Sequence, residues 1–363
     1  CILKANFHIL RLNKFLRKQR NGLMKLFMPE RVIFEPSSLK YPLGVELYDF
    51  FTNNDIEVIK STSNKTSSFI PGITPITKYT NSKKTILITT MKNKKLDFCS
   101  PSADYQFSLV SNCPGSCEYC YLQTTQGEKP SIKVYVNLED IFQVIKQHIK
   151  DEGITTFEVA SLGDPLALEH ITGSLAKTIE FFGELENAKL RVVTKFSNVD
   201  SLLQLKHNGN TRFRVSINTE NVIDNFEHNT ARLNERIETA SKLIAHNYPI
   251  GFIVAPIMVY DTWEEDYKDL FTLLYEGLGY KYNHEEITFE LIQHRFTARA
   301  KDMILQRFPH TKLDMDEEKR MLKWGRYGRF KYVYPKEQSC EIKTFISSLI
   351  MDKFPNAKIE YFT

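Results

Sequence analysis

The stretch Cys113-Pro-Gly-Ser-Cys117-Glu-Tyr-Cys120-Tyr places three of the chain's six cysteines in one short segment. Three thiols this close cannot all pair as disulfides, and one tight loop can aim their sulfur atoms at a single point. Thiolates bind soft metal centres such as iron–sulfur clusters and zinc. A closed site of either kind usually takes four protein ligands, so three cysteines leave one coordination position open for another molecule.

The spacing of these cysteines, with Tyr119 just before the last, resembles the signature of the radical S-adenosylmethionine enzymes. In that family the loop holds a 4Fe-4S cluster, whose fourth iron binds the amino and carboxylate groups of S-adenosylmethionine. The resemblance implies that Cys113, Cys117 and Cys120 are the cluster ligands. The alternative is a structural zinc loop, with Cys99 or a histidine as the fourth ligand.

Length and composition are those of an ordinary globular protein. The 363 residues can bury a full core, and 42% of them are hydrophobic and 25% charged. The formal charge of +4 is mild, so any contact with nucleic acid depends on a local basic patch. The sequence contains no run of eighteen apolar residues, so no membrane-spanning helix is predicted. The cysteine usage favours a reducing cytoplasm.

The chain divides by pattern into four segments. Residues 1–27 are basic and are expected to be a non-native or disordered extension, with the domain starting near Met24 or Met28. A small N-terminal α/β layer is expected over 28–103, and strands alternating with helices follow over 104–300. Residues 301–363 are expected to form a C-terminal DNA-binding hairpin and tail.

The alternation over 104–300 predicts a parallel sheet in which each crossover is a helix. Strands are expected at Tyr105–Val110, Phe157–Ala160, Leu190–Lys195, Phe213–Asn218, Gly251–Ile257 and Ile287–Ile292. Helices are expected at about 138–150, 166–183, 199–206, 232–246 and 263–277. Six such units are too few for a closed eightfold barrel, so the fold class is a partial (β/α)6 barrel. Its chemistry is expected at the carboxyl ends of the strands, where the cysteine loop follows the first strand.

The segment Trp324-Gly-Arg-Tyr-Gly-Arg-Phe-Lys-Tyr-Val-Tyr interleaves basic and aromatic residues. Basic groups can hold phosphates, while planar rings stack on bases or wedge between them. An ordinary hairpin with one aromatic face packed on the core would show the same pattern. The segment alone does not decide between these interpretations.

Several segments together resemble the spore photoproduct lyase family over about Val32 to Thr363. They include Cys120-Tyr-Leu-Gln-Thr-Thr, Val193-Thr-Lys-Phe, Arg212-Phe-Arg-Val-Ser-Ile-Asn, Gly251-Phe-Ile-Val-Ala-Pro-Ile, Ile287-Thr-Phe-Glu-Leu-Ile-Gln-His-Arg-Phe and Lys323-Trp-Gly-Arg-Tyr-Gly. That family repairs 5-thyminyl-5,6-dihydrothymine, the thymine dimer of ultraviolet-irradiated spores. The resemblance implies that a 5′-deoxyadenosyl radical abstracts hydrogen from C6 of the dihydrothymine, after which the methylene bridge between the bases breaks.

The resemblance also implies roles for individual residues. The S-adenosylmethionine site would be lined by Gly163, Lys195, Ser216, Asn218 and Ala255. Tyr119 and Tyr121 would relay hydrogen between substrate and cofactor. The hairpin would enter DNA at the lesion through Arg326, Tyr327, Arg329 and Lys331.

One departure concerns the hydrogen donor. Most members of the family carry a cysteine in the loop after the second strand, where it donates hydrogen to the product thymine radical, but this chain has Ser161 there. A serine O–H bond is much stronger than a thiol S–H bond, so Ser161 is a poor hydrogen-atom donor. Cys99 is the best candidate to replace it, and a small buried hydrophobe is the alternative interpretation of this residue. Cys340 and Cys1 are poorer candidates.

The expected partners are double-stranded DNA carrying the thymine dimer and an electron donor such as a flavodoxin or ferredoxin. No membrane is expected, a monomer suffices for one lesion per site, and the expected location is the cytoplasm of the spore core. Two alternatives stay open: a radical S-adenosylmethionine enzyme with another substrate, and a non-catalytic zinc-bearing module that binds nucleic acid.

Overall fold

The computed structural model describes residues 26–363 except 64–65, 126, 280–286 and 325–329. The chain forms two compact units. The first comprises the residues up to Pro114 together with Gln126–Val192 and Asn198–Thr211. The second comprises Gly115–Thr125, Val193–Ser197 and Arg212–Thr363. The cysteine motif is therefore divided, with Cys113 in the first unit and Cys117 and Cys120 in the second.

The first unit carries two groups of strands. Its strands are β1 (Arg31–Phe34), β2 (Glu57–Lys60), β3 (Thr85–Thr89), β4 (Asp97–Cys99), β5 (Ala103–Gln106), β6 (Val110–Ser111), β8 (Ile132–Tyr135), β9 (Thr155–Glu158) and most of β10 (Ala188–Thr194). Its helices are α2 (Pro42–Thr52), α3 (Pro75–Lys83), α5 (Leu138–Lys146), α6 (Glu169–Thr172) and α7 (Ser174–Gly183), with short 3-10 turns at Ser38–Lys40, Ser67–Phe69 and Pro165–Leu168.

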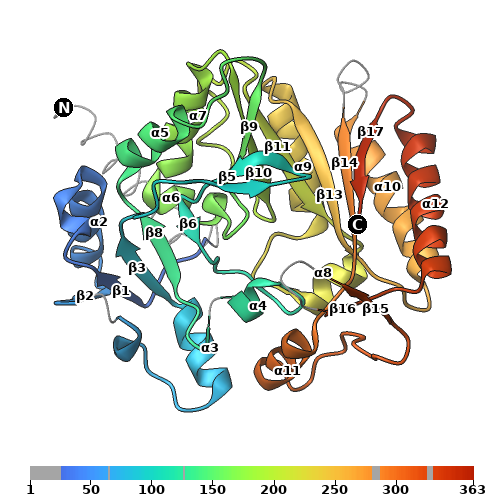
Figure 1. The fold of residues 1–363 in the computed structure, drawn as a ribbon, viewed down its shortest axis with the longest axis horizontal. Coiled ribbons are helices and arrows are strands. Elements are labelled where there is room, and N and C mark those ends of the chain that lie inside the picture. Colours follow the sequence, from blue (N-terminus) through green and yellow to red (C-terminus); the bar gives the residue numbers. More distant parts are fainter. Residues whose placement is uncertain (1–25, 64–65, 126, 280–286, 325–329) are drawn as a thin grey trace. The chain divides into compact units, whose positions relative to one another are not determined.

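One sheet of this unit has the order β2-β1-β3-β8-β6, with parallel pairing from β2 to β8 and antiparallel β6 at its edge. Every residue of β3 is buried, which explains its run of β-branched and apolar side chains. The other strands follow the order β10-β9-β5-β4, and only β4 is antiparallel to its neighbour. Helix α2 lies beside β1 and β2 (Figure 1).

The second unit begins at the cysteine loop and holds the C-terminal half of the chain. Its strands are β7 (Ser116–Cys117), β11 (Thr211–Ile217), β12 (Glu227–His228), β13 (Ile250–Ile257), β14 (Thr288–Gln293), β15 (Met321–Trp324), β16 (Phe330–Val333) and β17 (Lys358–Phe362). Its helices are α4 (Leu122–Thr125), α8 (Glu220–Phe226), α9 (Leu233–Ala245), α10 (Trp263–Leu278), α11 (Ala298–Arg307) and α12 (Lys336–Lys353).

Strands β11, β13, β14 and β17 pair in parallel in that order. The side chains of β11, β13 and β14 are almost all buried, as expected for parallel strands covered by crossover helices, whereas those of β17 are half-buried or exposed. Arg214 on β11 and Glu290 on β14 form a fully buried ion pair that spans β13, the strand between them. Helix α12 lies alongside α10, and β17 lies beside β14 (Figure 1).

The structure confirms strands in all six predicted segments, although the first is divided between β5 and β6. It also confirms the C-terminal hairpin, in which β15 and β16 pair antiparallel. The helix predicted at 199–206 is wrong, because these residues form successive turns. The amide of Leu202 bonds to the carbonyl of Val199, and Leu205 bonds to Leu202, three residues back in each case, so the segment tightens into turns.

Candidate active site

The start of the cysteine motif is held by backbone contacts within the first unit. Asn112 has a positive φ of 67° and pairs with Gly163 in an isolated parallel bridge. A Cβ atom on Gly163 would come within 2.6 Å of the Asn112 carbonyl oxygen, so this approach requires glycine. Lys83 Nζ donates to Asn112 Oδ1 at 2.9 Å and to the carbonyl oxygen of Cys113 at 2.8 Å. Gly163, predicted to line the cofactor site, thus packs against the residue preceding Cys113.

The remainder of the motif lies in the second unit on strand β7 and the turn that follows. Cys117 is buried and faces Glu227 in the antiparallel pairing of β7 with β12, while Ser116 faces His228. The Cys117 carbonyl accepts from the amide of Cys120 at 3.3 Å and from Gln123 Nε2 at 3.1 Å. Strand β12 and Gln123 therefore fix the backbone on either side of the cysteine turn.

A buried carboxylate, Glu227, joins three predicted or newly found site residues. Its Oε1 accepts from Lys195 Nζ at 2.8 Å and from the Tyr119 hydroxyl, and its Oε2 accepts from Arg236 Nη2 at 2.5 Å. Burial alone would raise the pKa of Glu227, but the charges of Arg236 and Lys195 outweigh it and hold that pKa at about 2. Burial and the nearby carboxylate raise the pKa of Tyr119 well above its usual value, so its phenol keeps its proton.

Lys195 contacts two other predicted cofactor-binding residues, Ser216 and Ala255. Its ammonium group donates to Ser216 Oγ at 2.9 Å and approaches the carbonyl oxygen of Ala255 at 3.3 Å. Asn218 is fully buried, and its amide bonds to the Pro256 carbonyl and to the hydroxyl of Tyr267. In this structure Asn218 thus ties the end of β11 to β13, next to Ala255.

Cys99 lies beside Ser161 in the first unit. The Cys99 sulfur is 3.5 Å from Ser161 Oγ, and Ser161 donates to Glu158 Oε1 at 2.5 Å. Glu158 also accepts from Ser102, whose carbonyl accepts from Arg191 Nη1 at 2.5 Å. The strand-end serine and the cysteine before the first predicted strand are therefore brought together, as the interpretation of Cys99 as a substitute donor requires.

The predicted DNA-binding hairpin is described only in its strands. Arg326, Tyr327 and Arg329 lie outside the described residues, whereas Lys331 lies on β16 directly opposite Lys323. Burial and the nearby charges of Arg295 and Lys323 lower the pKa of Lys331. Trp324 is 66% exposed and Phe330 50% exposed, and their rings meet edge to face. The strands thus present aromatic rings and paired cations to solvent.

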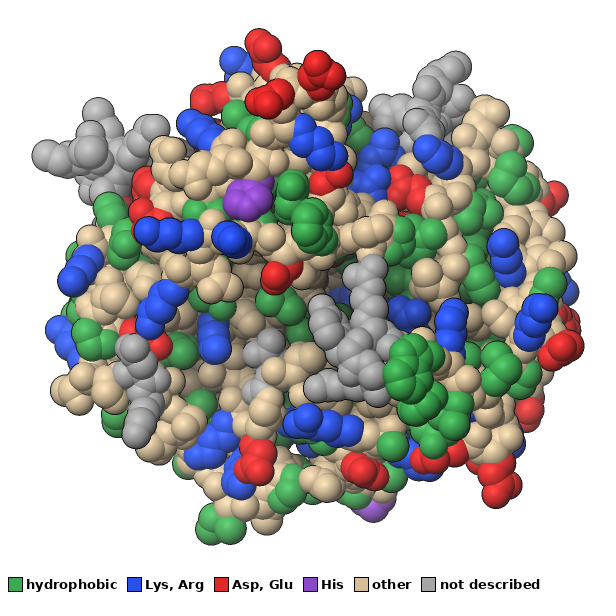
Figure 2. Space-filling view, in the orientation of Figure 1, with side chains coloured by type: hydrophobic (Ala, Val, Ile, Leu, Met, Phe, Trp, Pro, Cys, Tyr) green, Lys and Arg blue, Asp and Glu red, His purple; other side chains and the backbone are tan. Residues whose placement is uncertain are grey.

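On the face seen in Figure 2, the basic side chains of the described residues do not gather into one dominant patch. Figure 2 shows Lys and Arg side chains spread over the visible face among acidic ones, in keeping with the mild net charge. A local cationic site such as Lys323 and Lys331 is consequently the kind of feature that nucleic-acid binding would need.

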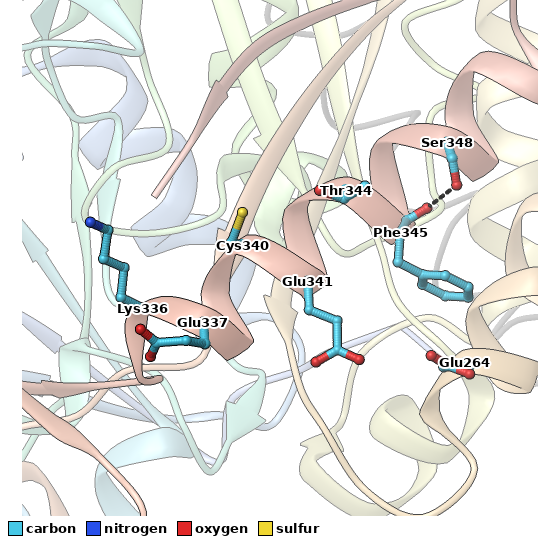
Figure 3. A pocket seen from close by; sticks show the side chains of 8 residues that line it. All are labelled: Glu264, Lys336, Glu337, Cys340, Glu341, Thr344, Phe345 and Ser348. Carbon is cyan, nitrogen blue, oxygen red and sulfur yellow. Dashed lines mark hydrogen bonds between the residues drawn. The ribbon is translucent and has the colours of Figure 1, made fainter.

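Of the two remaining cysteines, Cys340 belongs to the described residues. Cys340 is exposed on α12, in an open pocket whose lining side chains all come from α10 and α12 (Figure 3). Cys1 lies outside the described residues. None of the described cysteines forms a disulfide.

Sequence reasoning missed Glu227, Arg236, His228 and Glu118. His228 Nε2 lies 2.7 Å from Glu118 Oε1, so strand β12 is linked to the cysteine loop by side chains as well as by backbone. The available signal was weak: an acid directly after the apolar end of α8 and an arginine nine residues later. Their partners become visible only when β12 is paired with β7.

The three thiols of the motif are suitable ligands for an iron–sulfur cluster. The backbone that carries them is held by the Asn112–Gly163 bridge before Cys113 and by β12 at Cys117. Across the described residues, no three side chains of His, Cys, Asp or Glu are gathered closely enough to hold a metal ion as they stand. No described helix combines the length and apolar character needed to cross a membrane.

Known proteins resemble the chain over nearly its whole length. A family model described as spore photoproduct lyase matches residues 27–363. The spore photoproduct lyase of Bacillus subtilis (strain 168) is 48% identical over 339 residues, which cover 93% of this chain and 99% of that protein. The spore photoproduct lyase of Geobacillus sp. (strain Y412MC61) is 47% identical over 342 residues, covering 94% and 100%.

Solved structures agree with these relatives. Spore photoproduct lyase complexed with dinucleoside spore photoproduct superposes with a TM-score of 0.90 at 46% identity, covering 93% of this chain and 100% of that one. A mutant of the lyase with bound AdoMet and the same lesion gives the same values. This likeness confirms the predicted partial barrel.

The fold and the cysteine motif define a protein of the radical S-adenosylmethionine class, whose cofactors are a 4Fe-4S cluster and S-adenosylmethionine. The match over residues 27–363 is more specific. The chain belongs to the spore photoproduct lyase family.

Proposed function

We propose that the chain is a DNA-repair lyase that converts 5-thyminyl-5,6-dihydrothymine into two thymines. The observation that carries this proposal is the likeness, over 93% of the chain, to a lyase solved with the dinucleoside lesion bound. The cluster and S-adenosylmethionine supply the initiating radical when bound. The protein's own side chains bind the cofactor, keep water out and control how the reaction ends.

In this proposal Cys113, Cys117 and Cys120 hold the cluster and leave one position for S-adenosylmethionine. Support comes from the two backbone anchors of the motif, Asn112 with Gly163 in the first unit and β12 in the second. Lys195, with Ser216 and the Ala255 carbonyl beside it, offers a cation and polar atoms to the carboxylate and amino groups of the cofactor.

Cys99 is the proposed hydrogen-atom donor to the product radical. Its sulfur adjoins Ser161, the position where relatives usually carry the donor cysteine, and a thiol gives up hydrogen more readily than a hydroxyl. Tyr119 and Tyr121 are the proposed relay. The Tyr119 hydroxyl donates to Glu227 and Tyr121 is 56% exposed, so the two phenols meet different surroundings.

We further propose that the hairpin strands β15 and β16 bind lesion-bearing double-stranded DNA, with Lys331 as a phosphate contact. The exposed rings of Trp324 and Phe330 support this role, because aromatic side chains stack on bases or wedge between them. A flavodoxin or ferredoxin would supply electrons to a monomeric enzyme in the spore core.

The test is anaerobic reconstitution followed by incubation with the dinucleotide lesion. We expect a brown protein that cleaves S-adenosylmethionine on reduction and restores thymine in proportion to the lesion consumed. An intact cluster that cleaves S-adenosylmethionine without restoring thymine would indicate another substrate. A colourless protein that retains stoichiometric zinc would contradict the assignment to this chemistry.

A further inference from the structure

Glu227 is a buried anion whose two carboxylate oxygens both accept hydrogen bonds from residues of the site. One oxygen accepts from Lys195 and Tyr119, and the other accepts from Arg236. Arg236 is itself fixed, since its Nε donates to the Ala231 carbonyl at 2.9 Å and its Nη1 to the Ser216 carbonyl at 3.0 Å. A charge-paired carboxylate with this many fixed partners can adopt few other positions.

The backbone of the same residue holds the cysteine loop. Glu227 faces Cys117 across the β7–β12 pair, and the amide of Glu118 donates to the Phe226 carbonyl at 2.9 Å. The carbonyl of Lys195 accepts from the amide of Ala231 at 3.0 Å, just beyond β12. One short segment, 226–231, thus contacts both the cysteine loop and the lysine at the end of β10.

Lys195 can donate three hydrogen bonds, and the acceptors around its ammonium group include Glu227, Ser216 and the Ala255 carbonyl. Glu227 and Ser216 are bound at 2.8 and 2.9 Å, whereas the Ala255 carbonyl is farther away, at 3.3 Å. An incoming carboxylate can replace the longest of these bonds at the lowest cost. Glu227 and Ser216 would then keep the ammonium group in place while it binds the ligand.

We propose that Glu227 is a positioning residue that fixes Lys195 for the carboxylate of S-adenosylmethionine and ties it to the strand carrying Cys117. Arg236 is a second counter-ion of Glu227, so the buried carboxylate does not depend on Lys195 alone. This inference rests on the proposed assignment of Lys195 to the cofactor site. It predicts that Glu227 acts on cofactor affinity through Lys195 and not through the general stability of the fold.

The experiment is a double-mutant cycle on the cluster-loaded, unreduced protein, with the dissociation constant of S-adenosylmethionine measured by anaerobic equilibrium dialysis. We expect Glu227→Gln to weaken binding about tenfold, or about 1.4 kcal/mol, and Lys195→Met to weaken it at least as much. In the Lys195→Met background, Glu227→Gln should have no further effect, because the residue it positions is gone. Iron content should stay unchanged in Glu227→Gln, since its backbone pairing with Cys117 does not need the carboxylate.

Glu290→Gln is the matched control. Glu290 is another fully buried carboxylate of the same unit, paired with Arg214 and accepting from the hydroxyl of Tyr361. It should lower stability and leave the dissociation constant of S-adenosylmethionine unchanged. If Glu227→Gln gives too little folded protein, Glu227→Asp takes its place, because it keeps the charge but shortens the side chain. Like Glu227→Gln, it should weaken binding of S-adenosylmethionine alone but have no further effect in the Lys195→Met background.

Two results would overturn the inference: an unchanged dissociation constant in the Glu227 variants, or effects of Glu227 and Lys195 that simply add. An unchanged dissociation constant in Lys195→Met would instead show that Lys195 does not belong to the cofactor site. The inference about Glu227 would then be wrong as well, because it rests on that assignment. The single Lys195 variant therefore separates failure of the site assignment from failure of the positioning role.

Discussion

The sulfur of Cys99 lies 3.5 Å from the hydroxyl oxygen of Ser161, although 61 residues stand between them in the chain. Cys99 ends strand β4, and Ser161 follows strand β9, with β5 paired between these strands. A thiol on either residue would therefore occupy nearly the same place. This explains how a chain with serine at the usual donor position can still present a thiol there.

We expect Cys99→Ala to consume the lesion but to give incomplete repair or aberrant thymine products, because no nearby thiol then quenches the product radical. Ser161→Ala should be mild. Adding Ser161→Cys to Cys99→Ala should restore clean repair, since the new thiol stands beside the lost one. Liquid chromatography with mass spectrometry of the dinucleotide products measures all three. Clean, complete repair by Cys99→Ala alone would remove this residue from the reaction.

Gly163→Ala should destabilise the first unit and reduce cluster loading. Its new Cβ would lie 2.6 Å from the Asn112 carbonyl oxygen, so the backbone before Cys113 has to move. We expect a loss of about 1–3 kcal/mol in the free energy of unfolding, measured by denaturant titration, together with lower iron content. Gly153→Ala is the control, because Gly153 has a positive φ of 79° but open space around it. Equal iron loading in both variants would contradict a role for Gly163 in shaping the motif.

Lys331→Ala should weaken binding to duplex DNA and make that binding less dependent on salt. If Lys331 contacts one phosphate, the slope of log affinity against log salt concentration should fall by about one. Removing one of two cations that face each other across β15 and β16 should not destabilise the free protein. Fluorescence anisotropy at several salt concentrations gives the slope. An unchanged slope would mean that Lys331 does not touch the backbone of DNA.

His294 should make the fold sensitive to acid. Burial and the nearby Arg320 lower the pKa of His294 from 6.5 to about 3. Between these two pH values His294 is protonated in the unfolded chain and neutral in the folded chain. The resulting stability is fully present above pH 6.5 and is lost as pH falls towards 3, at up to about 1.4 kcal/mol per pH unit. His294→Gln should flatten the dependence of unfolding free energy on pH in this window. Matching curves for His294→Gln and the unmodified protein would contradict this assignment.

Periodicity predicted the strands of the barrel because buried parallel strands are continuous apolar runs, and the resemblance of the cysteine motif to a known family signature predicted the cofactor class. The pattern failed at residues 199–206, where helical spacing over eight residues is too short to outweigh the turn-forming bonds at Val199 and Leu202. It also gave no sign of Glu227, because the importance of this acid depends on a two-residue strand pair. Short pairings between distant segments leave almost no trace in composition or period. Cys99 was predicted from its place shortly before the first strand, and its closeness to Ser161 became visible only in the folded sheet.

The pairing of β7 with β12 also bears on the life of the protein in air. The backbone of Cys117 is held by its pairing with β12, and the backbone before Cys113 is held by the Asn112–Gly163 bridge. Neither pairing involves an atom of the cluster, so we expect both to persist when oxygen destroys it. Repair capacity would then return when new iron and sulfide enter a scaffold that is already folded, without synthesis of new protein.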